Sequence, residues 1–298
     1  MSSSPTLAWI LNLDVEQEWM QPGPWHRPQS IEAIVEAQYV RLRGNLVQPG
    51  QAIVGSEDVP PGTPCLAWSP TPWAHAEAKR HGLVLPPAPA AEVLRRVNHK
   101  QFVADHVPGF AGHRIDRTLW RAGEEMPWNL NAGGSWLLRR GFGAAGRGRI
   151  RVIETVGQAE ATWIAASHRM GDLCLEPWVQ VEAEYSTAGF IERDGGVEVA
   201  LPRIQEVDRA GQWLASTAIE RGDGRDMELL RSATRAAGTA LHQAGYWGPY
   251  SLDGFRYLAA DGSTAWQLLG DLNARFTMAW GLSFRAELRG DRLAAVRL

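Results

Sequence analysis

The chain lacks the features that would assign it to several specialised classes of protein. It has only two cysteines, Cys65 and Cys174, whose spacing fits neither a disulfide framework nor a zinc site. No apolar run approaches about 18 residues, so no membrane span is expected. The net charge is −3 with no long basic run, which argues against nucleic-acid binding. No secretion signal is recognised, and we expect a cytoplasmic location.

What is present is the composition of an ordinary folded protein. Apolar residues make up 45% of the chain and charged residues 21%. A length of 298 residues allows two or three subdomains and a sizeable core. Fourteen tryptophans are present, and we expect most of these large rings to lie in the core or in pocket walls.

The first of three predicted parts, residues 1–95, reads as a small α/β domain because strand-like and helix-like segments alternate. An apolar run over residues 7–14 predicts a strand. The spacing of apolar residues over 30–43 predicts an amphipathic helix. A Thr-Pro step at Thr71 opens another helix, which stops at Gly82.

The second part, residues 96–178, contains a possible helix start. Asn98 followed by Gln101 three positions later matches a capping box, which predicts that Asn98 begins a helix. Lys100 then falls in the first turn of that helix, and we expect its side chain to be exposed. Replacement of Lys100 by Ala should therefore leave the fold intact.

A Gly-rich hairpin is predicted later in the same part. The segment SWLLRRGFGAAGRGRIRVIET, which starts at Ser135, reads as a strand, a turn and a second strand. Its glycines let backbone N–H groups approach an anion closely, and its arginines supply positive charge. The alternative is a surface hairpin with solvated arginines. The segment is neither a P-loop nor a dinucleotide fingerprint, because no Gly-Lys-Ser/Thr follows and no helix begins at the turn.

The third part, residues 179–298, contains two predicted strands that carry oxygen ligands. The strand that starts at Gly248 carries Asp253, and the one that starts at Leu268 carries Asp271 and Asn273. Side chains at i and i+2 of a strand share a face, so Asp271 and Asn273 project together. Arg275 continues this row, and oxygen ligands beside a guanidinium suit magnesium and phosphate. The alternative is a solvated Asp and Asn near a turn.

The order of these elements along nearly the whole chain resembles the ATP-grasp superfamily. The matching segments are NHKQF, LLRRGFGAAGRGR, LEPWVQVEAEYS, GPYSLDGFRY and GDLNARF. The resemblance implies an α/β (α+β) fold with a small N-terminal α/β domain, a central lid domain and a C-terminal antiparallel-sheet domain. The expected boundaries are 1–95, 96–178 and 179–298, with ATP held between the last two domains.

The resemblance also implies roles for individual residues. Arg139 stands where the family usually has a second Lys, which puts the usual Lys geometry in doubt, and Asp271 stands where the family often has Glu. The implied metal ligands are Asp253, Asp271 and Asn273, and the implied catalytic residues are Arg275 and Arg139. The implied nucleotide-binding residues are Lys100, Arg139, Gly143, Gly146, Gly148, Glu176, Trp178, Val179 and Glu184.

The activity implied by the resemblance is ATP-dependent ligation. A carboxylate would take the γ-phosphoryl group of ATP, and an amine would attack the resulting acyl phosphate, with Mg²⁺ or alternatively Mn²⁺ as the metal. The partners would be small acids and amines, including amino acids or peptides, and a homodimer is an option. Two alternatives stay open: a kinase on the same scaffold, and nucleotide binding without turnover.

One substitution is a natural test of the implied metal site. If Asp271 belongs to a cluster of carboxylates, Asp271→Asn should relieve repulsion in the metal-free protein and retain the fold. The same change should abolish ADP formation, because the transferring phosphoryl group would lose charge stabilisation.

Overall fold

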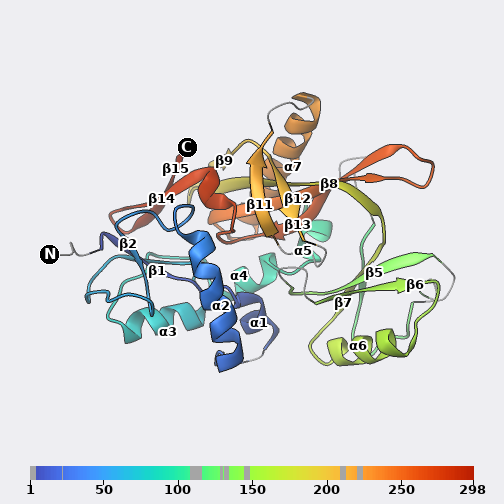
Figure 1. Ribbon diagram of the computed structural model, residues 1–298, viewed down its shortest axis with the longest axis horizontal. Helices are drawn as coiled ribbons and strands as arrows, with labels where there is room; N and C mark the ends of the chain where they lie inside the picture. Colours follow the sequence, from blue (N-terminus) through green and yellow to red (C-terminus); the bar gives the residue numbers. More distant parts are fainter. Residues whose placement is uncertain are drawn as a thin grey trace.

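Three main sheets, each formed from a different stretch of the chain, and a two-stranded C-terminal hairpin make up the architecture of the described residues (Figure 1). The computed structural model describes residues 5–21, 23–107, 116–127, 130, 134–143, 148–208, 213–219 and 224–298. Each sheet lies inside one of the three parts predicted from the sequence. No helix among these residues is long and apolar enough to cross a membrane.

The N-terminal sheet is parallel and has the strand order β2-β1-β3. Its strands are β1 (Leu7–Ile10), β2 (Gln51–Ile53) and β3 (Cys65–Ala67), and its helices are α1 (Val15–Met20), α2 (Gln29–Leu42), α3 (Pro72–Arg80) and α4 (Ala91–Val97). All four residues of β1 are buried, as expected for a central parallel strand. The hydroxyl of Thr71 accepts the backbone N–H of Ala74 at 3.3 Å, so the predicted helix start is confirmed. In contrast, α2 is mostly exposed.

The predicted capping box is wrong. Asn98 is the C-cap of α4, and the next helix, α5 (Phe102–His106), begins four residues later. The Asn98 amide donates to the carbonyl oxygens of Leu94 and Ala274, and its oxygen accepts the N–H of Ala274. Asn98 therefore ties the end of α4 to the C-terminal part of the chain. The sequence pattern could not distinguish this long-range contact from a local cap.

The central sheet is antiparallel, with the order β4-β7-β5-β6. Its elements are β4 (Thr118–Trp120), β5 (Ser135–Arg140), β6 (Arg149–Ile153), α6 (Gln158–His168) and β7 (Leu173–Pro177). The predicted Gly-rich hairpin joins β5 and β6. This sheet and α6 enclose a hydrophobic cluster of their own, which includes Trp120, Leu138 and Ile164. The central part therefore has a core separate from the rest of the protein.

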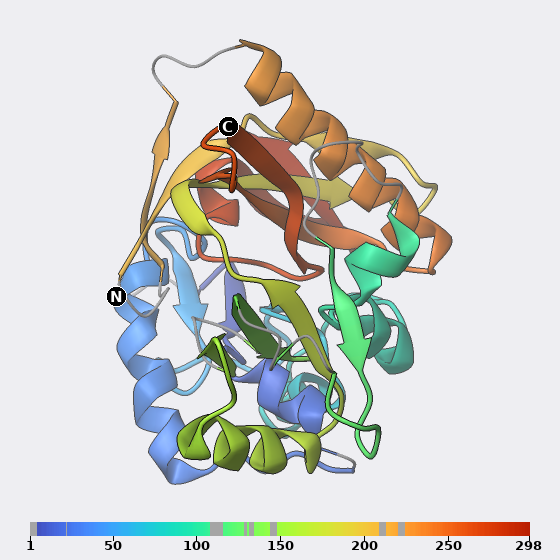
Figure 2. The ribbon, with the colours of Figure 1, turned by 90° about the vertical axis from the view of Figure 1, so that its right-hand side faces the viewer.

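The C-terminal sheet is antiparallel, with the order β11-β10-β8-β12-β13 and with β9 paired to β8. Its strands are β8 (Gln180–Ile191), β9 (Val197–Val199), β10 (Arg203–Val207), β11 (Trp213–Ala218), β12 (Gly248–Leu258) and β13 (Thr264–Asn273). Helix α7 (Gly224–Gln243) packs on this sheet through its apolar face, on which Leu230, Ala237 and Leu241 are buried. Figure 2 shows α7 and α6 at opposite ends of the molecule.

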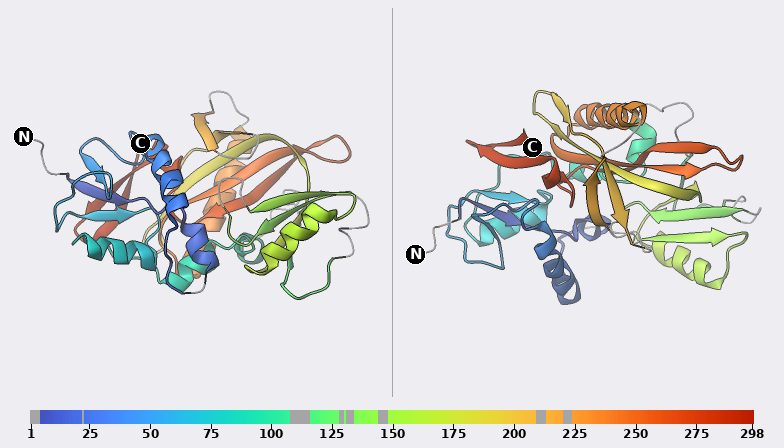
Figure 3. Two further views of the ribbon diagram at one scale, coloured as in Figure 1. Left: turned by 60° about the horizontal axis from the view of Figure 1, so that its bottom comes forward. Right: turned by 45° about the horizontal axis from the view of Figure 1, so that its top comes forward.

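The last elements join the C-terminal sheet to the N-terminal part. They are the 3₁₀ turn η2 (Trp280–Leu282) and the hairpin of β14 (Phe284–Arg289) and β15 (Arg292–Arg297). The Phe276 ring meets the rings of Trp9 and Trp280 edge-on, each at 5.0 Å. A Cβ on Gly281 would lie 2.6 Å from the backbone of Asn45, so the two parts approach closely at this glycine. Figure 3 shows the N-terminal and central parts on either side of the C-terminal sheet.

Candidate active site

A cleft of about 910 Å³ lies where the three parts meet. Its walls come from the N-terminal part, from β5 and the end of β7, and from β8, β12 and β13. Among the described residues predicted for the site, every one except Gly148 lines this cleft. They are Lys100, Arg139, Gly143, Glu176, Trp178, Val179, Glu184, Asp253, Asp271, Asn273 and Arg275.

Two glycines determine how β12 and β13 present their carboxylates. Asp253 and Asp271 are register partners on these neighbouring antiparallel strands, and the register shifts just beyond them. A Cβ on Gly270 would lie 2.5 Å from the backbone oxygen of Asp253, and one on Gly254 would lie 3.0 Å from the backbone oxygen of Gln267. A side chain at Gly270 is therefore incompatible with this strand geometry. The result is a pair of carboxylates facing the same cleft.

Asp271 is held by cations from other segments of the chain. Its carboxylate accepts from Lys100 Nζ at 2.9 Å and from Arg139 at 2.5 Å. Burial alone would raise the pKa of Asp271, but the charges of Arg139, Lys100 and Arg117 hold it well below its usual range. The expectation that Asp271 sits in a repelling carboxylate cluster is therefore wrong. The expectation that Lys100 is exposed is wrong too, because its side chain is only 8% exposed.

Arg117 is a central residue that the sequence analysis missed. Its guanidinium donates to Glu176 at 3.0 Å, to the backbone oxygen of Lys100 at 2.5 Å and to that of Gly270 at 3.0 Å. Arg139 binds the other oxygen of Glu176 at 3.3 Å. Burial would raise the pKa of Glu176, but Arg117 and Arg139 outweigh it and lower that pKa. No local pattern marks Arg117, because its partners come from three distant segments.

Asp253 has neutral partners instead of cations. Its carboxylate accepts from the Ser186 hydroxyl at 2.7 Å, the Gln205 amide at 2.8 Å and the Asn273 amide at 3.2 Å. Burial and, after it, the charge of Asp271 raise the pKa of Asp253 to about 6, although the hydrogen bond from Ser186 opposes this. The two carboxylates therefore differ sharply in their affinity for a proton.

The donor set at this position fits a hard divalent cation. Asp253, Asp271 and Asn273 offer oxygen atoms within one cleft, which is the chemistry that Mg²⁺ and Mn²⁺ prefer. No group of three or more His, Cys, Asp or Glu residues that could hold a metal occurs in the described parts of the chain. In the structure, Lys100 and Arg139 supply the positive charge at Asp271.

Arg275 follows β13 and is fixed by the N-terminal part. Its guanidinium pairs with Glu16 of α1, donates to Asn273 Oδ1 at 3.2 Å, and lies 5.4 Å from the Trp68 ring centroid. Both charged partners are buried, with side-chain exposures of 8% and 9%. Glu16 was not predicted for the site, and only the fold brings it near Arg275. The contact holds the Arg275 guanidinium at the edge of the cleft.

A two-residue link between the central and C-terminal sheets forms another wall. Trp178 and Val179 lie between β7, which ends at Pro177, and β8. The N–H of Trp178 donates to the Ser135 oxygen at 2.9 Å, and the Arg151 guanidinium stacks 4.5 Å from the Trp178 ring. On β8, Glu184 also lines the cleft, and burial raises its pKa.

The Gly-rich hairpin is only partly described. Gly143 lines the cleft, whereas Gly148, with φ of +72°, lies outside the lining. Gly146 is outside the described residues. The backbone oxygen of Gly141 accepts the N–H of Lys100 at 2.8 Å. The base of the hairpin is therefore joined to the segment that carries the cleft lysine.

Comparisons with known proteins identify the fold. No protein-family model and no curated protein sequence matches the chain. A carboxyaminoimidazole ribonucleotide synthase from Aspergillus clavatus, complexed with ATP, matches with a TM-score of 0.53 and 12% identity, over 92% of this chain and 71% of that one. A Rhizobium etli pyruvate carboxylase matches with a TM-score of 0.52 and 14% identity, over 91% and 24%. An N5-carboxyaminoimidazole synthetase from Staphylococcus aureus, complexed with ADP, matches with a TM-score of 0.50 and 8% identity, over 93% and 73%.

These likenesses extend over more than nine tenths of the present chain and over smaller shares of the three enzymes. At such low identities they establish the fold alone. The predicted α/β class and the predicted ATP-grasp fold are therefore confirmed.

Proposed function

Because the chain has the ATP-grasp fold, we propose that it is an ATP-dependent ligase that activates a carboxylate as an acyl phosphate for attack by an amine. The observation that supports this most directly is the meeting of three groups in one cleft. Lys100 and Arg139 bring positive charge, Asp253 and Asp271 bring metal-type ligands, and the link at residues 177–179 lines the same cleft.

The nucleotide would lie between the central and C-terminal sheets. Its adenine edge would meet the backbone around Trp178 and Val179, and its ribose would meet Glu184. Its phosphates would form ion pairs with Lys100 and Arg139, which pair with Asp271 in the structure. Arg117 would keep Glu176 in place during this exchange, because it also binds two backbone oxygens.

Asp253, Asp271 and the amide oxygen of Asn273 would hold Mg²⁺ or Mn²⁺. When bound, the ion would offset the phosphate charge that repels an attacking carboxylate. Asn273 now donates to Asp253 and accepts from Arg275, so its amide would have to share or release the Arg275 contact to bind a metal. Lys100 and Arg139 would then pair with the phosphates, and the metal would supply the positive charge at Asp271 in their place.

Arg275 would orient the acceptor acid and stabilise negative charge on the transferring phosphoryl group. The buried pair with Glu16 fixes its guanidinium, so little ordering is needed when the acid binds. The hairpin between β5 and β6 would cover the phosphates and exclude water, because water would hydrolyse an acyl phosphate.

The reaction balances without a side-chain nucleophile. An oxygen of the acid attacks the γ-phosphorus of ATP, and the bond to the β-phosphate oxygen breaks to release ADP. The amine nitrogen then attacks the acyl carbon, and the acyl–phosphate bond breaks to release phosphate. The amine loses a proton to the phosphate or to water. We also propose a cytoplasmic location, since the two free, buried thiols fit a reducing compartment.

Hydroxylamine trapping tests the reaction class. The protein is incubated with MgATP, hydroxylamine and pools of small acids, amino acids and peptides, and both ADP and hydroxamate are measured. We expect an acid that yields the two products in equal amounts, and we expect Arg275→Gln to lower both together. ADP formed with a phosphorylated product and without hydroxamate would contradict a ligase and identify a kinase.

A further inference from the structure

A second cavity, of about 380 Å³, lies at the seam between the N-terminal part and the C-terminal sheet. It shares Trp68 and Arg275 with the larger cleft, so these two side chains form a common wall between the cavities. Its other walls come from the ends of β3 and β8, the segment before β12 and the turn between β14 and β15. None of the residues predicted for the nucleotide site except Arg275 lines it.

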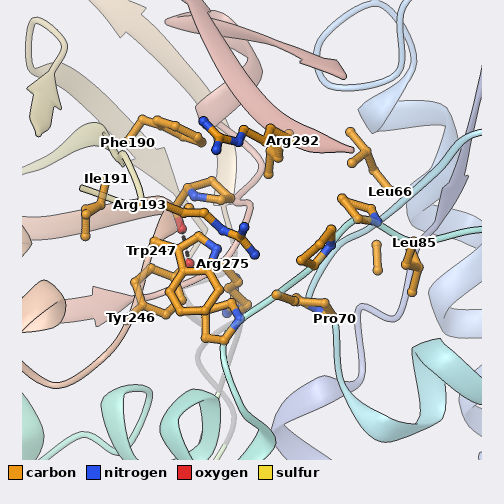
Figure 4. A pocket seen from close by; sticks show the side chains of 18 of the residues that line it. Leu66, Pro70, Leu85, Phe190, Ile191, Arg193, Tyr246, Trp247, Arg275 and Arg292 are labelled. Carbon is orange, nitrogen blue, oxygen red and sulfur yellow. Dashed lines mark hydrogen bonds between the residues drawn. The ribbon is translucent and has the colours of Figure 1, made fainter. Parts of the chain in front are cut away.

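The walls of this second cavity are apolar and preformed. Leu66 and Phe190 are almost completely buried, and Trp247 lies on the side of the cavity opposite Leu66 (Figure 4). The segment at residues 85–89, with the sequence Leu-Pro-Pro-Ala-Pro, forms one side. Because proline fixes its φ angle, this side loses little freedom when a ligand binds. A flat apolar group would therefore find a ready surface.

Two arginines reach this space without a carboxylate partner among the described residues. Figure 4 shows Arg193 extending over Trp247 and Arg292 lying beside Phe190. The Arg193 guanidinium stacks 5.1 Å from the Trp247 ring centroid, which restricts its motion and leaves its N–H edge free. Neither arginine takes part in any ion pair in the described structure.

Three acids also lie at the rim of the cavity. Asp194 is engaged in its own turn, where it accepts the N–H of Gly196 at 3.1 Å. Glu192 and Asp291 are exposed to solvent. The buried Arg275 adds a third positive group to the lining, although Glu16 neutralises it. Arg193 and Arg292 are therefore the charged side chains available to a ligand that packs on the apolar walls of this cavity.

We propose that this cavity binds a small organic acid with a flat apolar body and one carboxylate. The body would lie against Trp247 and Phe190, and the carboxylate would accept from Arg193 and Arg292 in the paired geometry that guanidinium groups favour. The site is separate from the nucleotide cleft, and the inference does not depend on the proposed ligase activity.

Calorimetry with the 298-residue protein, without added nucleotide, tests the site. The probes are benzoate and phenylacetate, their uncharged amides, and benzylamine as a cation of similar shape. We expect saturable binding of an acid, no binding of its amide or of the amine, and the same affinity when ATP is present. Arg193→Gln and Arg292→Gln should each weaken binding about tenfold or more.

Arg169→Gln is the matched control, because Arg169 is an exposed arginine at the end of α6, outside both cavities, and should leave the affinity unchanged. The two targeted arginines are on the surface, so their variants should fold. Equal binding of acid and amide, preference for the amine, or unchanged affinity in both variants would overturn the proposal. For an acid that binds, ADP formation with MgATP identifies it as a substrate.

Discussion

The Asp271→Asn substitution distinguishes two views of the cleft in the metal-free protein. The carboxylate of Asp271 is the shared partner of Lys100 and Arg139, at 2.9 and 2.5 Å. The amide would leave the buried Lys100 without its ion pair, while Arg139 would keep a contact with Glu176 at 3.3 Å. The fold should therefore lose stability, contrary to what the sequence led us to expect.

The size of this loss can be estimated from burial. Removing one partner of a buried ion pair costs about 3–5 kcal/mol. The Asp271 side chain is 25% exposed and that of Lys100 8%, so the lower end, about 3 kcal/mol, applies. At an unfolding entropy of about 2 cal/mol/K per residue, a chain of this length should lose about 5 °C in melting temperature.

Differential scanning calorimetry without divalent metal measures the effect, and Asp58→Asn is the control because Asp58 is exposed. Triphosphate added without metal should raise the melting temperature of Asp271→Asn more than that of the wild type, since Lys100 and Arg139 then need an anion. A variant that melts within about 1 °C of the wild type would refute the view that Asp271 anchors these cations.

Two further predictions concern stability. The pKa of Asp253 is raised to about 6 in the folded protein from an ordinary 3.8, so the folded wild type binds a proton more tightly than the unfolded chain. The free energy of unfolding of the wild type should therefore fall by up to about 3 kcal/mol from this group between pH 4 and pH 8. Urea unfolding without metal should show that Asp253→Asn lacks this part of the pH dependence, and an unchanged pH dependence would contradict the assignment. Gly281→Ala should lower the free energy of unfolding by about 2 kcal/mol or more, because the added Cβ would meet the Asn45 backbone. Gly224→Ala is the control and should be close to neutral, because its Cβ would meet no neighbour. Equal melting temperatures of the two variants would argue against the contact at Gly281.

Local patterns predicted much of the fold. The Thr71 cap of α3 depends on residues three positions apart, and it is present as predicted. The Asn98 pattern failed although it is equally local, because Ala274 offers partners that compete with the helix start. A sequence pattern cannot show such a competitor when it lies more than 170 positions away.

In the site, too, features set by neighbouring residues could be predicted, and features set by distant segments could not. The pairing of Asp271 and Asn273 could be predicted because residues two apart share a strand face. Arg117 and Glu16 could not, since each acts on a residue from another segment and neither stands in a distinctive pattern. The sequence also could not predict that Lys100 is buried and paired with Asp271, because this depends on how the central and C-terminal sheets pack.

Calorimetric titration with MgATP tests the central claim most directly. We predict that the wild type binds MgATP with a Kd below about 1 mM. Lys100→Met should weaken binding roughly 10- to 100-fold, the loss of one charge-assisted hydrogen bond to phosphate, while circular dichroism shows a retained fold. No saturable heat at millimolar MgATP, or an unchanged affinity in Lys100→Met, would contradict the assignment of this cleft as the nucleotide site.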